Sequence, residues 1–326
     1  MDPATPVTDE GPADADRSGG RSWHRSVVSG LAGLVAVAAF GWALKGQWAD
    51  IIEQLKRQHP AVVVTALLVA LLGVFMSFLL WRGTLRVLGS TLPRRPAARL
   101  FFVTQLGKYL PGAVWPVLAQ MRMGRSLGVP RQRMGLAFLL TLGLATLVGI
   151  LVGAAALPAL LEAEGRVVLL GLLAVPVLLA LLVPRVLNTL LNRALRLLRR
   201  PGLDSPLSGR DMARGVGWAI AFWVVYGGHV WVLAVGLGAD PWQALPVAIG
   251  GFAIAFSLGP LLVVLPAGAG VREAVLVVLL HSVLSTSEAT AVALTSRGIL
   301  MATDGLLALA AGLVPHRQHA EQDAPA

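Results

Sequence analysis

The sequence predicts an all-α, polytopic helical membrane protein with about seven to nine spanning segments. Hydrophobic residues make up 56% of the 326 residues and charged residues only 13%, and the mean hydropathy is +0.73. This composition is typical of membrane proteins rather than soluble domains. Several apolar windows also reach the roughly 20 residues that a helix needs to cross a hydrocarbon core about 30 Å thick.

The formal charge of +10 does not by itself indicate nucleic-acid binding. The arginines stand in short loops between apolar spans, a pattern that favours the positive-inside bias and contact with anionic lipid headgroups. The chain contains no cysteine. A disulfide framework, a thiolate metal site and a cysteine nucleophile are therefore excluded.

Composition divides the chain into three parts. Residues 1–22 are rich in Pro, Gly, Ala and acidic side chains, which predicts a disordered tail. We expect a transmembrane domain over 23–314 and a second disordered tail over 315–326. The first apolar run is far from Met1 and lacks a small-residue cleavage site, so a retained helix is favoured over a signal peptide.

The apolar segments are taken in chain order. Uninterrupted spans are predicted at roughly 27–44, 61–81, 134–157, 167–184, 213–236, 243–258 and 291–314. Two further apolar stretches, 100–121 and 259–280, are interrupted by Gly, Pro and charged residues.

Loop charge predicts the orientation of the spans. Residues 82–99 and 122–133 carry arginines and no acidic residue, and 185–212 carries six arginines against two aspartates. Basic loops of this kind are expected in the cytoplasm, and the acidic loop 158–166 outside. The N-terminus is then cytoplasmic, in a multi-pass protein of the cell membrane.

The stretch QLGKYLPGAVWPVL, within 100–121, is a poor spanning helix. Proline interrupts helices and Lys108 is costly in hydrocarbon. Because the loops on both sides are basic, both ends should share the cytoplasmic side. A segment of about 22 residues is too short for two crossings, so we expect two half-helices that meet near Leu110, Pro111 and Gly112.

The second interrupted stretch, SLGPLLVVLPAGAGVREAVLVVLL, resembles the first at its break. Leu265, Pro266 and Gly268 echo the Leu-Pro-Gly of the earlier break, which indicates a weak internal duplication. Paired broken segments in corresponding halves point to a midplane binding site in transporters. Loop charge around 259–280 is too sparse to decide whether this stretch re-enters or crosses.

Charged residues at the two breaks have both a functional and a structural interpretation. Lys108 either faces a polar cavity or extends its ammonium to the interface. Arg272 and Glu273 open an apolar helix after a Gly-rich break, where a helix start favours an anion. They either form a site or only cap an interfacial helix end. Neighbours on a helix point in different directions, so the two need not pair.

The last span carries two charges on one face. Arg297 and Asp304 are seven positions apart, or about 10.5 Å along a helix axis, too far for a direct pair. Each is expected to find partners in the broken segments, although Arg297 at the membrane edge is an equal alternative. His229 is a lone histidine in an apolar span, and a hydrogen-bonded structural role is favoured.

Motifs for catalysis are missing from the sequence. There is no P-loop, GxSxG or HExxH motif, and the only Asp-x-Asp lies in the N-terminal tail. We therefore expect no enzyme activity, no metal site and no cofactor.

Two parts of the sequence resemble the lysylphosphatidylglycerol synthase transmembrane family, and the resemblance extends over roughly 27–314. They are GKYLPGAVWPVL followed by RSLGVPRQRM, and LPAGAGVREAVLVVLL followed by Arg297. The resemblance implies broken or re-entrant helices and, for one branch, translocation of a modified phospholipid. The matching positions are Lys108, Pro111, Gly112, Gly268, Gly270, Arg272, Glu273 and Arg297. Only PHRQHAEQDAPA follows the last span, so the aminoacyltransferase domain of the bifunctional members is not expected. Other relatives are fused to glycosyltransferases, which leaves a polyprenyl-linked or glycolipid substrate open.

Two functions follow as hypotheses. The first is a lipid translocase for an anionic or aminoacylated phospholipid or a related lipid-linked headgroup, with the matching positions and Asp304 binding the substrate. Without an ATP site, transport would be facilitated or ion-coupled. The second is a non-transporting membrane partner that anchors a separate lipid- or glycan-modifying enzyme through the basic loops.

Overall fold

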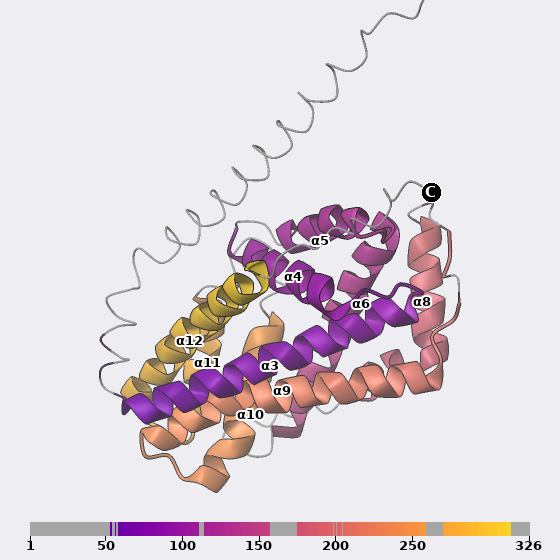
Figure 1. Cartoon of the computed structure of the whole chain (residues 1–326). Coiled ribbons are helices and arrows are strands. Elements are labelled where there is room, and N and C mark those ends of the chain that lie inside the picture. The colour runs from indigo at the N-terminus through magenta and orange to yellow at the C-terminus, as the bar shows by residue number, and fades with distance from the viewer. Residues whose placement is uncertain are drawn as a thin grey trace, which may run out of the picture.

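The computed structural model describes residues 53, 56, 58–110, 114–156, 175–197, 199, 201–203, 205–258 and 270–313. Within these residues the regular structure is helical throughout, as Figure 1 shows, which confirms the all-α prediction. The predicted tails, the first span at 27–44 and the acidic loop 158–166 lie outside the described residues.

Among the described residues, five helices are long and apolar enough to cross a membrane, and they confirm five of the predicted spans. They are α3 (Pro60–Val87), α6 (Arg131–Ala156), α9 (Gly209–Gly236), α10 (Pro241–Leu258) and α12 (Thr286–Gly312). Local sequence defines where they begin. Ser208 and Ser285 each accept from the third backbone N–H of the following helix, and an acidic side chain there bonds back to the serine N–H.

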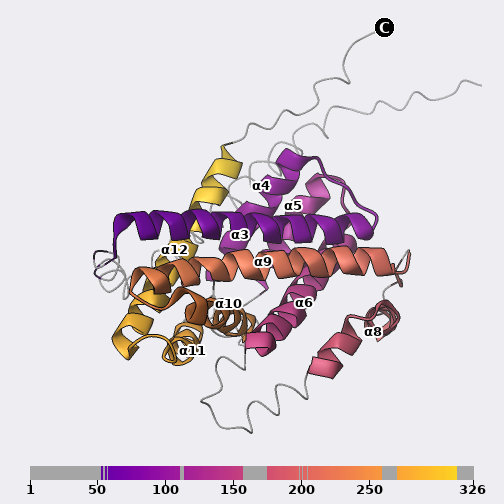
Figure 2. The same ribbon diagram turned by 90° about the horizontal axis from the view of Figure 1, so that it is seen from below.

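Helices α3 and α9 form the central antiparallel pair, which crosses the molecule in both Figure 1 and Figure 2. Gly73 of α3 lies so close to α9 that an added Cβ would stand 2.8 Å from the Tyr226 Cα. Gly236 at the other end of α9 meets Val62 at the start of α3. Small residues allow this approach, because helices in lipid associate largely through close packing.

Helix α6 packs on α9 and α10 through a glycine pair. A Cβ at Gly149 would lie 2.4 Å from the Ser257 Oγ, and one at Gly153 would lie 2.2 Å from a side-chain carbon of Ile254. The GxxxG spacing of this pair therefore places the α10 backbone against α6. Trp223 of α9 completes the contact by donating to the Ala145 carbonyl at 2.8 Å.

The basic ends of the spans gather at one end of the bundle. Arg133 at the start of α6 donates to the carbonyl of Gly89, just after α3 ends. Because α3 and α9 are antiparallel, Arg210 and Arg214 at the start of α9 lie at this end too. The shared placement agrees with the loop charges that predict a cytoplasmic side here.

Part of the predicted span 167–184 lies outside the described residues. The described remainder is followed by a sharp bend. A helix over Val175–Leu181 meets α8 (Pro184–Leu197) at an angle of 72°. Helix α8 lies beside the start of α9 in Figure 1, where the Asn188 side chain makes two hydrogen bonds with the Leu207 backbone. The sequence did not predict a separate helix in this basic segment.

The interrupted stretch 100–121 is broken as predicted. It consists of α4 (Arg94–Gln105), a four-residue 3₁₀ turn η1 (Leu106–Tyr109) and α5 (Trp115–Ser126). Helices α4 and α5 lie side by side, and a Cβ on Gly107 would lie 3.0 Å from the Pro116 nitrogen. The two arms therefore fold back on each other, while Pro111 and Gly112 lie outside the described residues.

The second interrupted stretch is described only from Gly270. This glycine has φ of 86°, a left-handed conformation that costs glycine little, and it precedes α11 (Val271–Leu280). Gly268 and the expected break lie outside the described residues, so the internal duplication stays a prediction. Helix α11 packs between α10 and α12.

Replacing Gly73 with alanine should destabilise the protein, because the new methyl group would collide with the α9 backbone at Tyr226. Overpacking of this kind costs about 1–3 kcal/mol. Gly83→Ala on the same helix is the matched control, since nothing described lies within 4 Å of its Cβ. Thermal unfolding in detergent should show a lower Tm for Gly73→Ala only. Equal Tm values for the two variants would contradict the close approach.

Single cysteines should report the orientation of the bundle, because the chain has no native cysteine. Ser205 and Gln243 are exposed and flank opposite ends of α9. An impermeant maleimide should label Ser205→Cys from the cytoplasmic side and Gln243→Cys from the outside. Right-side-out and inverted membrane vesicles distinguish the two, and the reverse pattern would invert the predicted topology.

Candidate functional site

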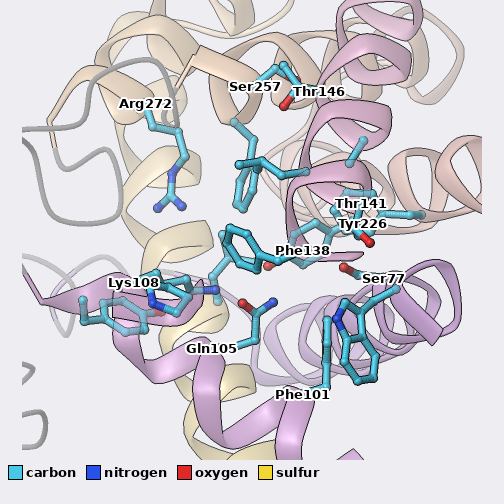
Figure 3. Close-up of a pocket in the computed structure, with 18 of the residues that line it drawn as sticks. Ser77, Phe101, Gln105, Lys108, Phe138, Thr141, Thr146, Tyr226, Ser257 and Arg272 are labelled. Carbon is cyan, nitrogen blue, oxygen red and sulfur yellow. The ribbon is translucent and has the colours of Figure 1, made fainter. Parts of the chain in front are cut away.

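A cavity of about 230 Å³ lies where the broken segment α4–η1–α5 meets α3, α6, α9, α10, α11 and α12. Figure 3 shows charged side chains at one side of this cavity and aromatic and hydroxyl side chains at the other. Its lining residues include Trp81, Phe101, Gln105, Lys108, Tyr109, Gln120, Thr141, Phe222, Trp223, Tyr226, Phe256, Arg272 and Arg297. An apolar interior with a charged end matches an amphipathic ligand.

The 3₁₀ turn η1 places Lys108 against α12. The Lys108 ammonium lies 2.7 Å from the Asp304 Oδ2. The neighbouring Tyr109 hydroxyl donates to the same oxygen at 2.5 Å. Only 1% of the Asp304 side chain is exposed, against 25% for Lys108. Lys108 thus pairs inside the protein, and the alternative in which it reaches only for the interface is wrong.

The start of α11 holds a second charged group. The Glu273 Oε1 lies 2.8 Å from a terminal nitrogen of Arg272 and 3.1 Å from one of Arg297. Its Oε2 accepts from the Gly270 N–H at 2.7 Å, so the carboxylate also caps the helix. Arg272 and Glu273 pair although they are adjacent, and Arg297 is buried beside its partner Glu273. Whether Arg297 lies near a membrane edge stays a prediction.

Residues Arg297 and Asp304 find their partners in different broken segments, as the sequence predicts. Glu273 of α11 contacts Arg297, and Lys108 of η1 contacts Asp304. The five side chains comprise three cations and two carboxylates, which leaves one net positive charge. In a low-dielectric cavity this excess favours an anionic group.

Two buried atoms of this cluster have no hydrogen-bond partner among the described residues. They are the Arg297 Nε and the Asp304 Oδ1. Leaving a buried donor or acceptor unsatisfied costs about 1–3 kcal/mol, and more when the group is charged. Such orphaned atoms beside a cavity indicate a place where a ligand or water completes the hydrogen bonds.

Sequence reasoning missed the aromatic wall of the cavity. The two tyrosines of the chain, Tyr109 and Tyr226, are both buried in it. The Phe256 ring centroid lies 5.8 Å from the Arg272 guanidinium carbon, within cation–π range. Tyr109 directly follows Lys108 in the broken stretch, which was an available signal, whereas Tyr226 lies in the middle of an uninterrupted span and gave none.

Other predicted residues have separate roles or positions. His229 is fully buried and its Nε2 lies 2.8 Å from the Ser296 hydroxyl, which confirms a structural role. Pro111, Gly112 and Gly268 lie outside the described residues. Gly270 contributes its backbone N–H to Glu273. Within the described ranges, no three His, Asp or Glu side chains converge as metal ligands would.

The fold and the cavity define a polytopic helical membrane protein with a charged internal site. Residues 29–308 match the family model described as the lysylphosphatidylglycerol synthase TM region. The chain belongs to this family. No curated protein matches the chain.

Removal of the Glu273 carboxylate should destabilise the site strongly. Glu273→Ala leaves two buried guanidinium groups near each other without their shared anion. Breaking a buried pair costs about 3–5 kcal/mol. Glu288→Ala, at the exposed start of α12, is the control and should lower Tm much less. A comparable loss of Tm in the two variants would show that the Glu273 contacts contribute little.

Proposed function

We propose that this protein is a lipid translocase of the cell membrane, acting on an anionic or aminoacylated phospholipid or a related lipid-linked headgroup. The observation that carries the proposal is the cavity, with an apolar and aromatic interior and three cations at one end. A phosphate-bearing lipid has the same two parts. The proposed activity is transport rather than catalysis.

The cations are arranged to receive the headgroup phosphate. Arg272 and Arg297 both line the cavity, and both form an ion pair with the same carboxylate, that of Glu273. Guanidinium groups form paired hydrogen bonds with phosphate oxygens. Lys108 reaches the same cavity from the opposite broken segment. A phosphate between these groups would satisfy the excess positive charge and the free Arg297 Nε.

The remaining parts of the site have supporting roles. Glu273 and Asp304 set the local charge, and either could receive an amino group of the headgroup. The predicted breaks at Pro111, Gly112, Gly268 and Gly270 would line the route of the headgroup. Irregular backbone at membrane depth is tolerated where it faces protein or a water-filled cavity. The predicted pair of breaks corresponds to the paired broken helices of transporters.

The proposed orientation places the basic end of the bundle and the N-terminus in the cytoplasm, where anionic lipids attract arginines. The alternative function is a membrane partner that anchors a separate lipid- or glycan-modifying enzyme. It would use the same basic end and would not require the charged cavity. Purified protein that moves no lipid yet copurifies with such an enzyme would favour this alternative.

Arg272→Ala should abolish headgroup translocation in reconstituted vesicles, because it removes a cation from the cavity and leaves the net charge neutral. The assay follows a fluorescent anionic phospholipid that becomes accessible to a membrane-impermeant quencher. Arg214→Ala is the matched control, an exposed arginine in α9 that does not line this cavity. Its translocation rate should equal that of the unaltered chain.

The site assignment depends on the comparison between these variants. Unchanged translocation by Arg272→Ala would remove Arg272 from the site, and equal losses in both variants would indicate a general effect of surface charge. Arg272→Lys retains the charge without the paired donors, so partial activity is expected from it. Each variant must show an unchanged Tm before its rate is interpreted.

A further inference from the structure

Asp304 differs from Glu273, the other carboxylate of the charged cluster, in how its oxygens are used. Both oxygens of Glu273 have partners, since Oε1 contacts two arginines and Oε2 accepts from the Gly270 N–H. Asp304 receives both of its contacts on Oδ2, and its buried Oδ1 has none among the described residues. Asp304 is therefore the less well satisfied of the two anions.

Lys108 can pair with either of two anions, Asp304 or the proposed phosphate. It neutralises Asp304 at 2.7 Å, and the same ammonium lines the cavity where the proposed phosphate binds. If a phosphate draws Lys108 away, Asp304 is left as a buried anion without its counter-ion. Such a carboxylate is costly unless it takes up a proton.

We propose that Asp304 is a proton-binding site that couples proton uptake to binding of the anionic headgroup. The inference rests on the proposed function and deepens it by naming the coupling ion. Protonation of Asp304 releases Lys108 and raises the net charge of the five-residue cluster from +1 to +2. Anion binding and proton binding then favour each other by the same factor, because linkage is reciprocal.

Other charged and titratable groups lie on the elements that pack against α12, among them His229 of α9, which contacts Ser296. Tyr109 donates to it from η1, and Tyr226 of α9 interacts with it electrostatically. Arg272 and Glu273 of α11 and Arg297 of α12 form the neighbouring ionic group. Helices α3 and α4 also pack on α12, and their charged side chains are Arg82, Arg86, Arg94, Arg95 and Arg99.

The proton step is balanced without a further reactant. A hydronium ion gives its proton to the Asp304 carboxylate, which forms an O–H bond and leaves a water molecule, and the ion pair with Lys108 is lost. Tyr109 lines the cavity and already contacts Asp304, so it lies on the route. Release of the headgroup returns Lys108 to Asp304, and the proton leaves to water.

Proton uptake can be measured directly on the purified full chain in a weakly buffered detergent solution. The probe is dihexanoyl phosphatidylglycerol, a soluble phosphodiester whose own charge does not change near neutral pH. The unaltered protein should take up about one proton for each probe bound. Its affinity should fall up to about tenfold for each unit rise in pH over the range in which one proton is taken up for each probe bound.

Asp304→Asn should bind the probe with no proton uptake and no pH dependence, because Lys108 is already free. Glu288→Gln, an exposed carboxyl at the start of the same helix, should behave as the unaltered chain. Infrared difference spectra test the inference without relying on the Asn variant. Probe binding should produce a protonated-carboxyl band, and Asp304→Glu should shift its frequency.

The possible outcomes distinguish a failure of the proton coupling from a failure of the translocase proposal. Binding and translocation without proton uptake would overturn the coupling and leave the translocase standing. Proton uptake or the carboxyl band persisting unchanged in the Asp304 variants would place the proton on another residue. If the unaltered chain neither binds the probe nor moves lipid in vesicles, the translocase proposal fails and the coupling fails with it.

Discussion

The structure depends on keeping five charged side chains partnered inside an apolar bundle. Burying an isolated ion in hydrocarbon costs much free energy, so each of these charges must lie in contact with an opposite charge. Asp304 meets this requirement through Lys108, and Glu273 through two arginines. These contacts connect the broken segment and α11 to a single helix, α12. The same requirement therefore fixes both the electrostatics of the cavity and the relative placement of its walls.

Close helix packing provides the frame that holds these charges in position. Gly73, Gly149 and Gly153 bring α3, α6, α9 and α10 to distances at which an added methyl group would collide with a neighbour. Edge-to-face and tilted rings of Phe252, Phe256 and Tyr226 fill the space beside the charged cluster. Beside this apolar frame, the Lys108–Asp304 ion pair and the Tyr109–Asp304 hydrogen bond link the broken segment to α12.

Sequence patterns predicted the features that depend on local order. Hydropathy identified five spans, and the seven-residue spacing of Arg297 and Asp304 showed that one helix face would present two charges in need of partners. Which partners they find depends on long-range packing. Lys108 and Asp304 are 196 positions apart, and no local pattern links Tyr109 to the same carboxylate. The sequence did not predict helix α8, because the arginines of this segment are equally typical of a cytoplasmic loop.

Stability alone is a poor explanation for this cluster. Buried ion pairs are often no more stabilising than apolar residues of similar size, because desolvation offsets their attraction. Here the cluster also leaves the Arg297 Nε and the Asp304 Oδ1 unsatisfied within the described residues. Because Lys108 lies on the turn between α4 and α5, moving that turn away from α12 must break its pair with Asp304. Under the proposed function, an anion that replaces Asp304 as the partner of Lys108 would offset the loss of that ion pair.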